Sequence, residues 1–210
     1  MDLLENISLS LKRGEFDKTA ELTAQAVKQK LPPKQILDDG LIAGMKIVGE
    51  QFKCHDIFLP DVLLAAKAMY AGLDILRPLF IDEDMPSRGK IVLGTVQGDL
   101  HDIGKNLVSI MLKGSGFDVI DLGNDVSPQR FVETALKENA PVIGLSALLT
   151  TTMPVMKSVV DLVKEEGLSG RIKVAIGGAP VTQQYADEIG ADAYGFDGMD
   201  AVECIDKLLS

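Results

Sequence analysis

The chain has 210 residues, of which 46% are apolar, and it carries a formal net charge of −10. This apolar content is sufficient for a folded core and excludes an intrinsically disordered chain. The acidity, together with the absence of any Lys/Arg cluster, argues against nucleic acid and anionic membranes as partners, because both bind concentrated positive charge.

The cysteines and the first residues of the chain predict a reduced compartment. Cys54 and Cys204 lie far apart and form neither a CxxC pair nor a zinc-ligand spacing. The N-terminal residues do not have the pattern of a signal peptide. Charges interrupt every apolar stretch before the roughly 20 residues that a membrane span needs. We therefore expect a soluble, cytoplasmic protein.

Residues 1–82 predict a domain made of helices only. Apolar residues recur at helical spacing from residue 3 to 11, over 15–31, over 34–52 and from about 60 to 79. Pro32 and Pro33 separate the second helix from the third, and Pro33 suits the first turn of the third. Four helices with short connections favour a four-helix bundle.

Residues 83–88 are acidic and contain Pro86, which predicts a linker. Beyond it, over residues 89–210, short apolar strands alternate with helices. The strands are expected at 90–96, 117–122, 141–146, 172–177 and 193–196, and the helices at 103–115, 128–139, 154–167, 180–189 and 199–209. Continuously apolar strands separated by helices favour a parallel sheet covered on both faces. Five of them predict a flavodoxin-like (Rossmann-like) α/β domain.

In such a domain, ligands bind beyond the carboxyl ends of the strands. Four loops at that edge are rich in glycine or in small hydroxyl residues: 97–104, 146–152, 177–180 and 195–198. A tight turn between strand and helix explains any one of them. Several on one edge favour a ligand site, because small residues let a ligand approach the backbone closely.

His101, one of two histidines, follows the first strand in the segment QGDLHDIG. An isolated loop histidine is most often a solvated surface residue. Asp99, however, can accept a hydrogen bond from one imidazole nitrogen and leave the other as a ligand. A zinc site needs three or four protein ligands, which this edge does not offer. A single imidazole suits a metal held by a macrocycle, as the axial histidine of haem proteins illustrates.

Three blocks at fixed intervals resemble the cobalamin-binding fingerprint D-x-H-x-x-G, S-x-L, G-G. Here Asp99-x-His101-x-x-Gly104 is followed after 41 residues by Ser146-x-Leu148 and after 28 more by Gly177-Gly178. The helical half is similar to the cap domain of methionine synthase, especially around residues 56–62. The whole chain resembles the corrinoid proteins of methanol, methylamine, betaine and methoxyaromatic methyltransferase systems.

This resemblance implies base-off/His-on binding of cobalamin or a related corrinoid. His101 would be the lower axial ligand to cobalt, Asp99 would hold its other nitrogen, and Thr152 would stand where methionine synthase has a serine in that relay. The other expected cofactor contacts are Gly98, Leu100, Asp102, Ile103, Gly104, Ser146, Leu148, Thr150, Gly177, Gly178, Tyr194 and Gly198. In the cap, Phe58, Leu59 and Val62 would form an apolar lid, with plain bundle core as the alternative.

The resemblance also implies a methyl carrier of one-carbon metabolism that turns over no substrate alone. It would accept a methyl group on cob(I)alamin from a substrate-specific methyltransferase. It would then pass the methyl group to a second methyltransferase that uses tetrahydrofolate or a thiol. A reductive activation protein would be a further partner.

Three other functions share part of this pattern. A mutase subunit would add a substrate-binding barrel, for which this chain has no room. A cobalamin sensor and a cofactor-free flavodoxin-like signalling module stay open as alternatives, because fold alone does not decide function.

Overall fold

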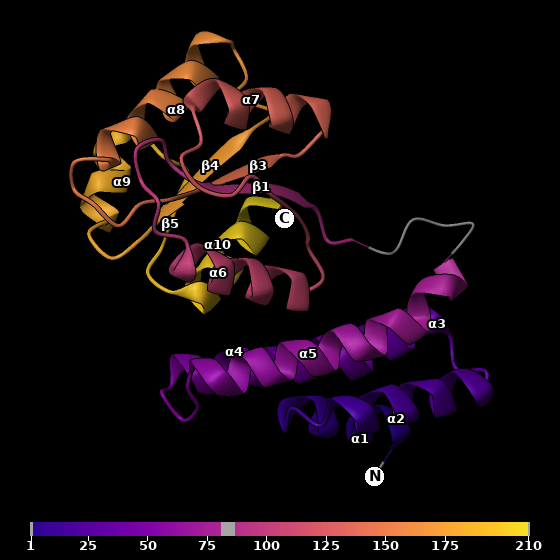
Figure 1. The fold of residues 1–210 in the computed structure, drawn as a ribbon. Coiled ribbons are helices and arrows are strands. Elements are labelled where there is room, and N and C mark those ends of the chain that lie inside the picture. Colours follow the sequence, from indigo (N-terminus) through magenta and orange to yellow (C-terminus); the bar gives the residue numbers. More distant parts are fainter. Residues whose placement is uncertain (1, 81–86, 210) are drawn as a thin grey trace. The chain divides into compact units, whose positions relative to one another are not determined.

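A computed structural model describes residues 2–80 and 87–209. The chain divides into two units, a helical unit that ends at Ser87 and a sheet unit that begins at Arg88 (Figure 1). Of the linker expected at residues 83–88, residues 83–86 lie outside the described residues. None of the described helices combines the length and the hydropathy needed to cross a membrane.

Over residues 2–80, the helical unit forms four helical runs, as the apolar spacing predicts. They are α1 (Leu3–Lys12), α2 (Phe16–Lys28), a continuous run of α3 (Pro33–Gln35), the π-helix η1 (Ile36–Ile42) and α4 (Ala43–Lys53), and finally α5 (Leu59–Leu76) with the 3₁₀ turn η2 (Arg77–Phe80). Their fully buried side chains include Ile7, Leu11, Leu41, Val48 and Leu76. Gly72 lets α5 approach the core, because a Cβ there would lie 2.6 Å from Leu41 Cδ2.

The sheet unit contains five parallel strands in the order β2-β1-β3-β4-β5. The strands are β1 (Lys90–Thr95), β2 (Asp118–Asp121), β3 (Val142–Ser146), β4 (Lys173–Gly177) and β5 (Ala193–Gly195). This order confirms the flavodoxin-like prediction. The direction of winding reverses between β1 and β3, so the ligand crevice of this fold lies at their carboxyl ends.

Helices cover both faces of the sheet. One face carries α6 (Ile103–Gly114) and α10 (Gly198–Leu209), and the other carries α7 (Pro128–Lys137), α8 (Met153–Glu165) and α9 (Gln183–Ile189) (Figure 1). Phe131, Met156 and Val159 from the second group belong, with Ile143 of the sheet, to one buried cluster. Apolar strands buried on both faces explain why their sequences do not alternate.

The strand register brings the carboxyl ends into one row. Thr95 on β1 pairs with Ser146 on β3, which pairs with Gly177 on β4, which pairs with Gly195 on β5. The loops that follow these residues therefore emerge side by side. This row is the base of the candidate site.

Candidate functional site

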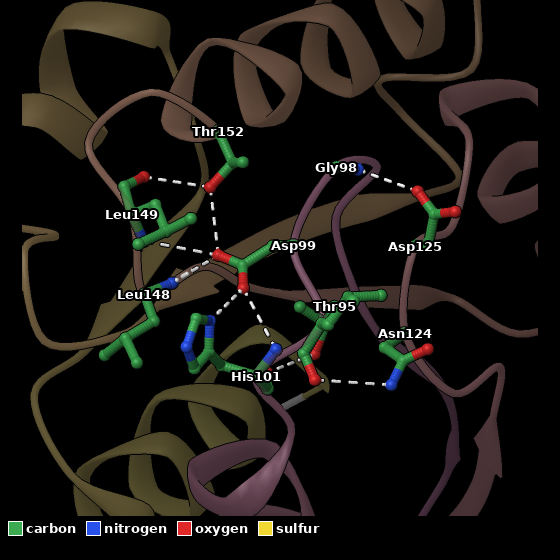
Figure 2. A network of polar contacts seen from close by, with 10 residues as sticks. Thr95, Gly98, Asp99, His101, Asn124, Asp125, Leu148, Leu149 and Thr152 are labelled. Carbon is green, nitrogen blue, oxygen red and sulfur yellow. Dashed lines mark hydrogen bonds and ion pairs between the residues drawn. The ribbon is translucent and has the colours of Figure 1, made fainter.

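The loop between β1 and α6 places Asp99 and His101 together. The Asp99 side chain is fully buried, whereas the His101 side chain is 52% exposed. Asp99 Oδ1 accepts two hydrogen bonds from His101, from the main-chain N–H at 3.0 Å and from ring Nδ1 at 2.7 Å (Figure 2). The buried carboxylate thus fixes both the loop and the imidazole ring.

The second oxygen of Asp99 is held by the β3–α8 loop. Asp99 Oδ2 accepts hydrogen bonds from the main-chain N–H of Leu148 at 2.8 Å, from that of Leu149 at 3.2 Å and from the hydroxyl of Thr152 at 2.9 Å (Figure 2). The structure therefore brings Asp99, His101 and Thr152 together. Sequence reasoning missed the two main-chain donors, because a backbone amide leaves no residue signature.

Asp99 stays ionised in this setting. Burial raises the pKa of its carboxyl, but the hydrogen bonds from Leu148, His101 and Thr152 outweigh burial and hold the pKa far below its usual range. An ionised carboxylate only accepts, so His101 Nδ1 carries the proton of the 2.7 Å contact. In the neutral imidazole, Nε2 is then unprotonated and available as a ligand.

Thr152 shares its single hydroxyl proton between two acceptors. Its Oγ1 lies 2.9 Å from Asp99 Oδ2 and also 2.9 Å from the main-chain oxygen of Leu149. Its methyl group packs toward the histidine loop, where a Cβ at Gly98 would lie 3.5 Å from Thr152 Cγ2. Threonine therefore supplies the hydroxyl expected of a serine and adds an apolar contact.

Around His101 the edge exposes large apolar side chains. Leu100, Ile103 and Leu148 are exposed, as is Phe196 after β5. Gly104 is open as well, because a Cβ there would meet no atom within 4 Å. Exposed apolar groups that surround a single ligand atom fit a large, mostly apolar ring system.

The glycines after β4 have a reason within the chain itself. Gly178 has φ +130°, and a Cβ there would lie 1.9 Å from the main-chain oxygen of Ala147. A Cβ at Gly177 would lie 3.0 Å from the oxygen of Gly195. The close approach of the Ala147 main chain therefore already requires glycine at position 178. The expected passage of a nucleotide tail along these residues stays a prediction.

The remaining expected positions differ in accessibility. Thr150 and Asp102 are exposed or partly exposed, and Ser146 and Tyr194 are partly buried. Gly198 is buried, and a Cβ there would lie 2.3 Å from Met111 Sδ on α6. Packing of α10 on α6 therefore accounts for glycine at that position, with no need for a ligand.

The three expected lid residues lie in the helical unit at the start of α5. Phe58 is 68% exposed and Leu59 is partly buried, whereas Val62 has no exposed surface. The main-chain N–H of Phe58 donates to Asp61 Oδ2 at 2.9 Å, which defines the N-terminus of the helix. Phe58 thus presents its ring to the surroundings, and Val62 belongs to the core.

A further set of polar contacts reaches the histidine loop from the β2–α7 loop. Asp125 accepts the N–H of Gly98 at 2.8 Å, and Asn124 Nδ2 donates to the oxygen of Leu100 at 3.3 Å (Figure 2). Neither residue was predicted. The turn-type segment Gly123-Asn124-Asp125 after the second strand is the signal that marks them.

The donor set fits a metal whose other ligands come from a bound molecule. Within residues 2–80 and 87–209, no group of three or more His, Cys, Asp and Glu residues is placed to hold a metal ion. His101 instead offers one free nitrogen beside exposed apolar side chains. This arrangement fits a corrinoid and does not fit a zinc site.

Comparisons with known proteins agree with this fit. Residues 89–203 match a family model described as a B12 binding domain, and residues 3–77 match a second model with the same description. A dimethylamine corrinoid protein of Methanosarcina acetivorans is 49% identical over 195 residues, which cover 92% of each chain. A corrinoid protein of Desulfitobacterium hafniense is 44% identical over 212 residues, covering 100% of this chain and 98% of the relative.

A solved structure is similar over almost the whole chain. It is the methanol:cobalamin methyltransferase complex of Methanosarcina barkeri, with a TM-score of 0.88, 32% identity, and coverage of 99% of this chain and 79% of that chain. Together with the two family models, these matches favour corrinoid binding over a cofactor-free signalling module. The chain therefore belongs to the corrinoid proteins, with B12-binding domains in both halves and cobalamin or a related corrinoid as its cofactor.

Proposed function

We propose that this corrinoid protein carries methyl groups between two methyltransferases. Similarity to the dimethylamine corrinoid protein and to a chain of the methanol:cobalamin methyltransferase complex supports the proposal. When bound, the corrinoid supplies a cobalt centre that accepts a methyl group in its reduced state and yields it to an acceptor. The chain itself binds, orients and shields this cofactor, and has no substrate turnover of its own.

His101 is the lower axial ligand in this proposal, and the lower base of the cofactor is displaced from the metal. The observation that carries this assignment is the 2.7 Å contact between Asp99 Oδ1 and His101 Nδ1, which leaves Nε2 as the free nitrogen. The carboxylate orients the ring and sets its tautomer, as partners of metal-bound histidines do. Thr152 and the amides of Leu148 and Leu149 hold the carboxylate in turn.

The exposed apolar groups of the edge have a shielding role. Leu100 and Ile103 lie in the histidine loop and Leu148 in the adjoining β3–α8 loop; their exposed side chains would exclude water from a bound ring system, for which Gly104 leaves room. In the helical unit, Phe58 stays the expected lid residue. The Phe58 side chain is 68% exposed, which leaves its ring accessible to an apolar ligand.

The partners follow from the proposed role. A substrate-specific methyltransferase delivers the methyl group, and a second methyltransferase transfers it to tetrahydrofolate or to a thiol. A reductive activation protein restores the reduced cofactor after oxidation. Methylated amines are the first donors to test, because the similar protein of Methanosarcina acetivorans is a dimethylamine corrinoid protein.

Axial ligation is tested by spin resonance. The protein is produced with ¹⁵N-labelled histidine, reconstituted with hydroxocobalamin without oxygen, and reduced to cobalt(II). A ¹⁵N-labelled histidine nitrogen bound to cobalt splits each cobalt line into a doublet, whereas an unlabelled ¹⁴N ligand, such as the lower base of the cofactor, splits it into a triplet. We expect doublets in the wild type and in His55→Ala, which alters the other histidine, and their loss in His101→Ala. Triplets in the labelled wild type would contradict ligation by histidine.

Methyl transfer is tested with partner methyltransferases from the same source. Dimethylamine, trimethylamine, methanol, betaine and a methoxyaromatic compound are offered in turn, and the absorption spectrum follows methylation of the reduced protein. Tetrahydrofolate and a thiol are then compared as acceptors with the second methyltransferase. If the protein binds the corrinoid but none of the combinations of donor and partner methylates it, it would be a sensor or store, and the carrier function would be wrong.

A further inference from the structure

The histidine loop is held from a second side, by the loop between β2 and α7. Asp125 Oδ1 accepts the N–H of Gly98 at 2.8 Å, and the N–H of Asp125 donates to the oxygen of Asp99 at 3.1 Å. Asn124 Nδ2 donates to the oxygen of Leu100 at 3.3 Å. These contacts differ from those of the β3–α8 loop, because they hold the main chain of the histidine loop and leave the Asp99 side chain untouched.

Four consecutive residues of the histidine loop each have a main-chain polar atom held by a hydrogen bond, three by the β2–α7 loop and one by β1. To the contacts at Gly98, Asp99 and Leu100, the hydroxyl of Thr95 adds a hydrogen bond to the oxygen of His101 at 3.0 Å (Figure 2). A loop so fully bonded has one backbone path. The position of the imidazole then depends on these contacts as well as on Asp99.

The backbone of Asp125 indicates that its contact matters. Asp125 has φ +53°, a left-handed conformation that costs an L-residue about 1 kcal/mol. Gly98, its hydrogen-bond partner, has φ +84°, which glycine adopts without cost. The strained conformation aims both the N–H and the carboxylate of Asp125 at the histidine loop.

A partly buried ion pair ties the same β2–α7 loop to the helix that follows His101. Lys105 on α6 is only 3% exposed and pairs with the carboxylate of Asp121 at the end of β2. Asp121 Oδ1 in turn accepts the N–H of Gly123 at 2.9 Å. The histidine loop, α6 and the β2–α7 loop therefore form a closed ring of contacts.

We propose that Asp125, assisted by Asn124, is a positioning residue for the axial ligand. It fixes the main chain on both sides of Asp99 and thereby sets where His101 Nε2 lies. A directional metal–nitrogen bond needs its ligand held within about 0.5 Å, and the contacts of Asp125 with the main chain add to those of Asp99 with His101 in meeting that need. The inference rests on the proposed ligation of cobalt by His101.

The test uses Asp125→Gly, which removes the acceptor and does not introduce the strain of a Cβ at positive φ. Asp125→Asn retains an acceptor oxygen and tolerates the same φ. Asn139→Gly is the matched control, because Asn139 also has φ +53° and its side chain accepts a hydrogen bond from Arg171, after α7 and away from the site.

Two measurements are made on each variant. Amide hydrogen exchange of the cofactor-free protein reports the bond at Gly98. The labelled-histidine spin resonance experiment reports the share of cobalt(II) ligated by the protein. We expect Asp125→Gly to expose the Gly98 amide and to lower the ligated share while corrinoid is still bound. Asp125→Asn and Asn139→Gly should behave as the wild type does.

Each outcome has a distinct meaning. An unchanged ligated share in Asp125→Gly, with a ligated wild type, overturns the positioning role and leaves the proposed function intact. A wild type without protein-derived nitrogen overturns the proposed function itself. If Asp125→Gly does not fold, Asn124→Ala replaces it, since it removes the contact at Leu100 without touching a positive-φ residue; a wild-type ligated share there also overturns the inference.

Discussion

One carboxylate oxygen of Asp99 accepts both the main-chain N–H and the ring Nδ1–H of His101, at 3.0 Å and 2.7 Å. The Asp99 carboxylate accepts five hydrogen bonds, so the site needs an ionised side chain that only accepts. The geometry therefore predicts what happens when that side chain becomes an amide.

Asp99→Asn should switch the tautomer of His101. The new amide NH₂ would turn toward His101, because fewer hydrogen-bond donors face that side than face the side of Leu148 and Thr152. In that orientation the NH₂ would donate a hydrogen bond to His101 Nδ1. The imidazole proton would then move to Nε2 and block ligation. Nitrogen NMR of the cofactor-free protein measures the tautomer, and labelled-histidine spin resonance measures ligation. Asp118→Asn is the control for the lost charge, because Asp118 is the first residue of β2 and lies at the opposite edge of the sheet from the site. An Asn variant with Nδ1 still protonated and full ligation would contradict this account.

Thr152→Val should weaken the site more than Thr152→Ser does. Valine keeps the shape but leaves Asp99 with one donor fewer, which we expect to cost about 1 to 2 kcal/mol in the free energy of unfolding. Serine keeps the hydroxyl and loses only a methyl contact, at about 0.5 to 1.5 kcal/mol. Urea unfolding of the cofactor-free protein measures both. The decisive comparison is ligation, which serine should retain and valine should reduce; equal ligation in both would remove Thr152 from the relay.

Gly178→Ala should prevent folding of the sheet unit or destabilise it by more than about 3 kcal/mol, because the new Cβ would lie 1.9 Å from the oxygen of Ala147. Gly167→Ala separates this clash from the effect of positive φ. Gly167 has φ +69° and no atom within 4 Å of its Cβ position, so alanine there should cost about 1 kcal/mol. Thermal unfolding with a circular dichroism readout compares the two. Similar losses would mean that the loop at Ala147 moves aside.

Gly104→Ala should separate stability from binding. No atom lies within 4 Å of its Cβ position, and alanine in the first turn of α6 is a better helix former by up to about 1 kcal/mol. The melting temperature of the cofactor-free protein should stay the same or rise. Corrinoid affinity, measured by absorption titration, should fall, because the methyl group occupies space left for the ligand. Gly170→Ala, equally open but before β4, should leave affinity unchanged; a wild-type affinity for Gly104→Ala would place the ring elsewhere.

Lys105→Met should loosen the support of the histidine loop. It removes the buried cation and leaves Asp121, whose side chain is 28% exposed, with the Gly123 N–H as a remaining donor. Because the carboxylate keeps access to water, we expect a loss of about 1 to 3 kcal/mol in the free energy of unfolding, less than for a fully buried pair. The double variant Lys105→Met with Asp121→Asn should recover part of it. A purely additive double variant would show that the two side chains do not interact.

Much of the molecule followed from sequence because the relevant signals are local. Apolar spacing indicated the helices of residues 1–82, and alternating apolar strands and helices indicated the parallel sheet. Asp99 and His101 were accessible as candidates because they lie in a loop at the carboxyl edge of the predicted sheet, and Thr152 was named because it stands where methionine synthase has a serine. The structure then placed His101 and Thr152 within hydrogen-bonding distance of the Asp99 carboxylate.

The tertiary structure decided what the residue types do not encode. The amides of Leu148 and Leu149 reach Asp99 through the backbone path of their loop, and any side chain on that path would leave the same donors. Asp125 touches the histidine loop only because β2 lies beside β1. Sequence by itself thus determined the fold class and singled out His101 as the candidate ligand, since periodicity and motif spacing are properties of the chain. Which groups hold that histidine in place depended on long-range packing, because hydrogen bonds between loops form only once the strands are side by side.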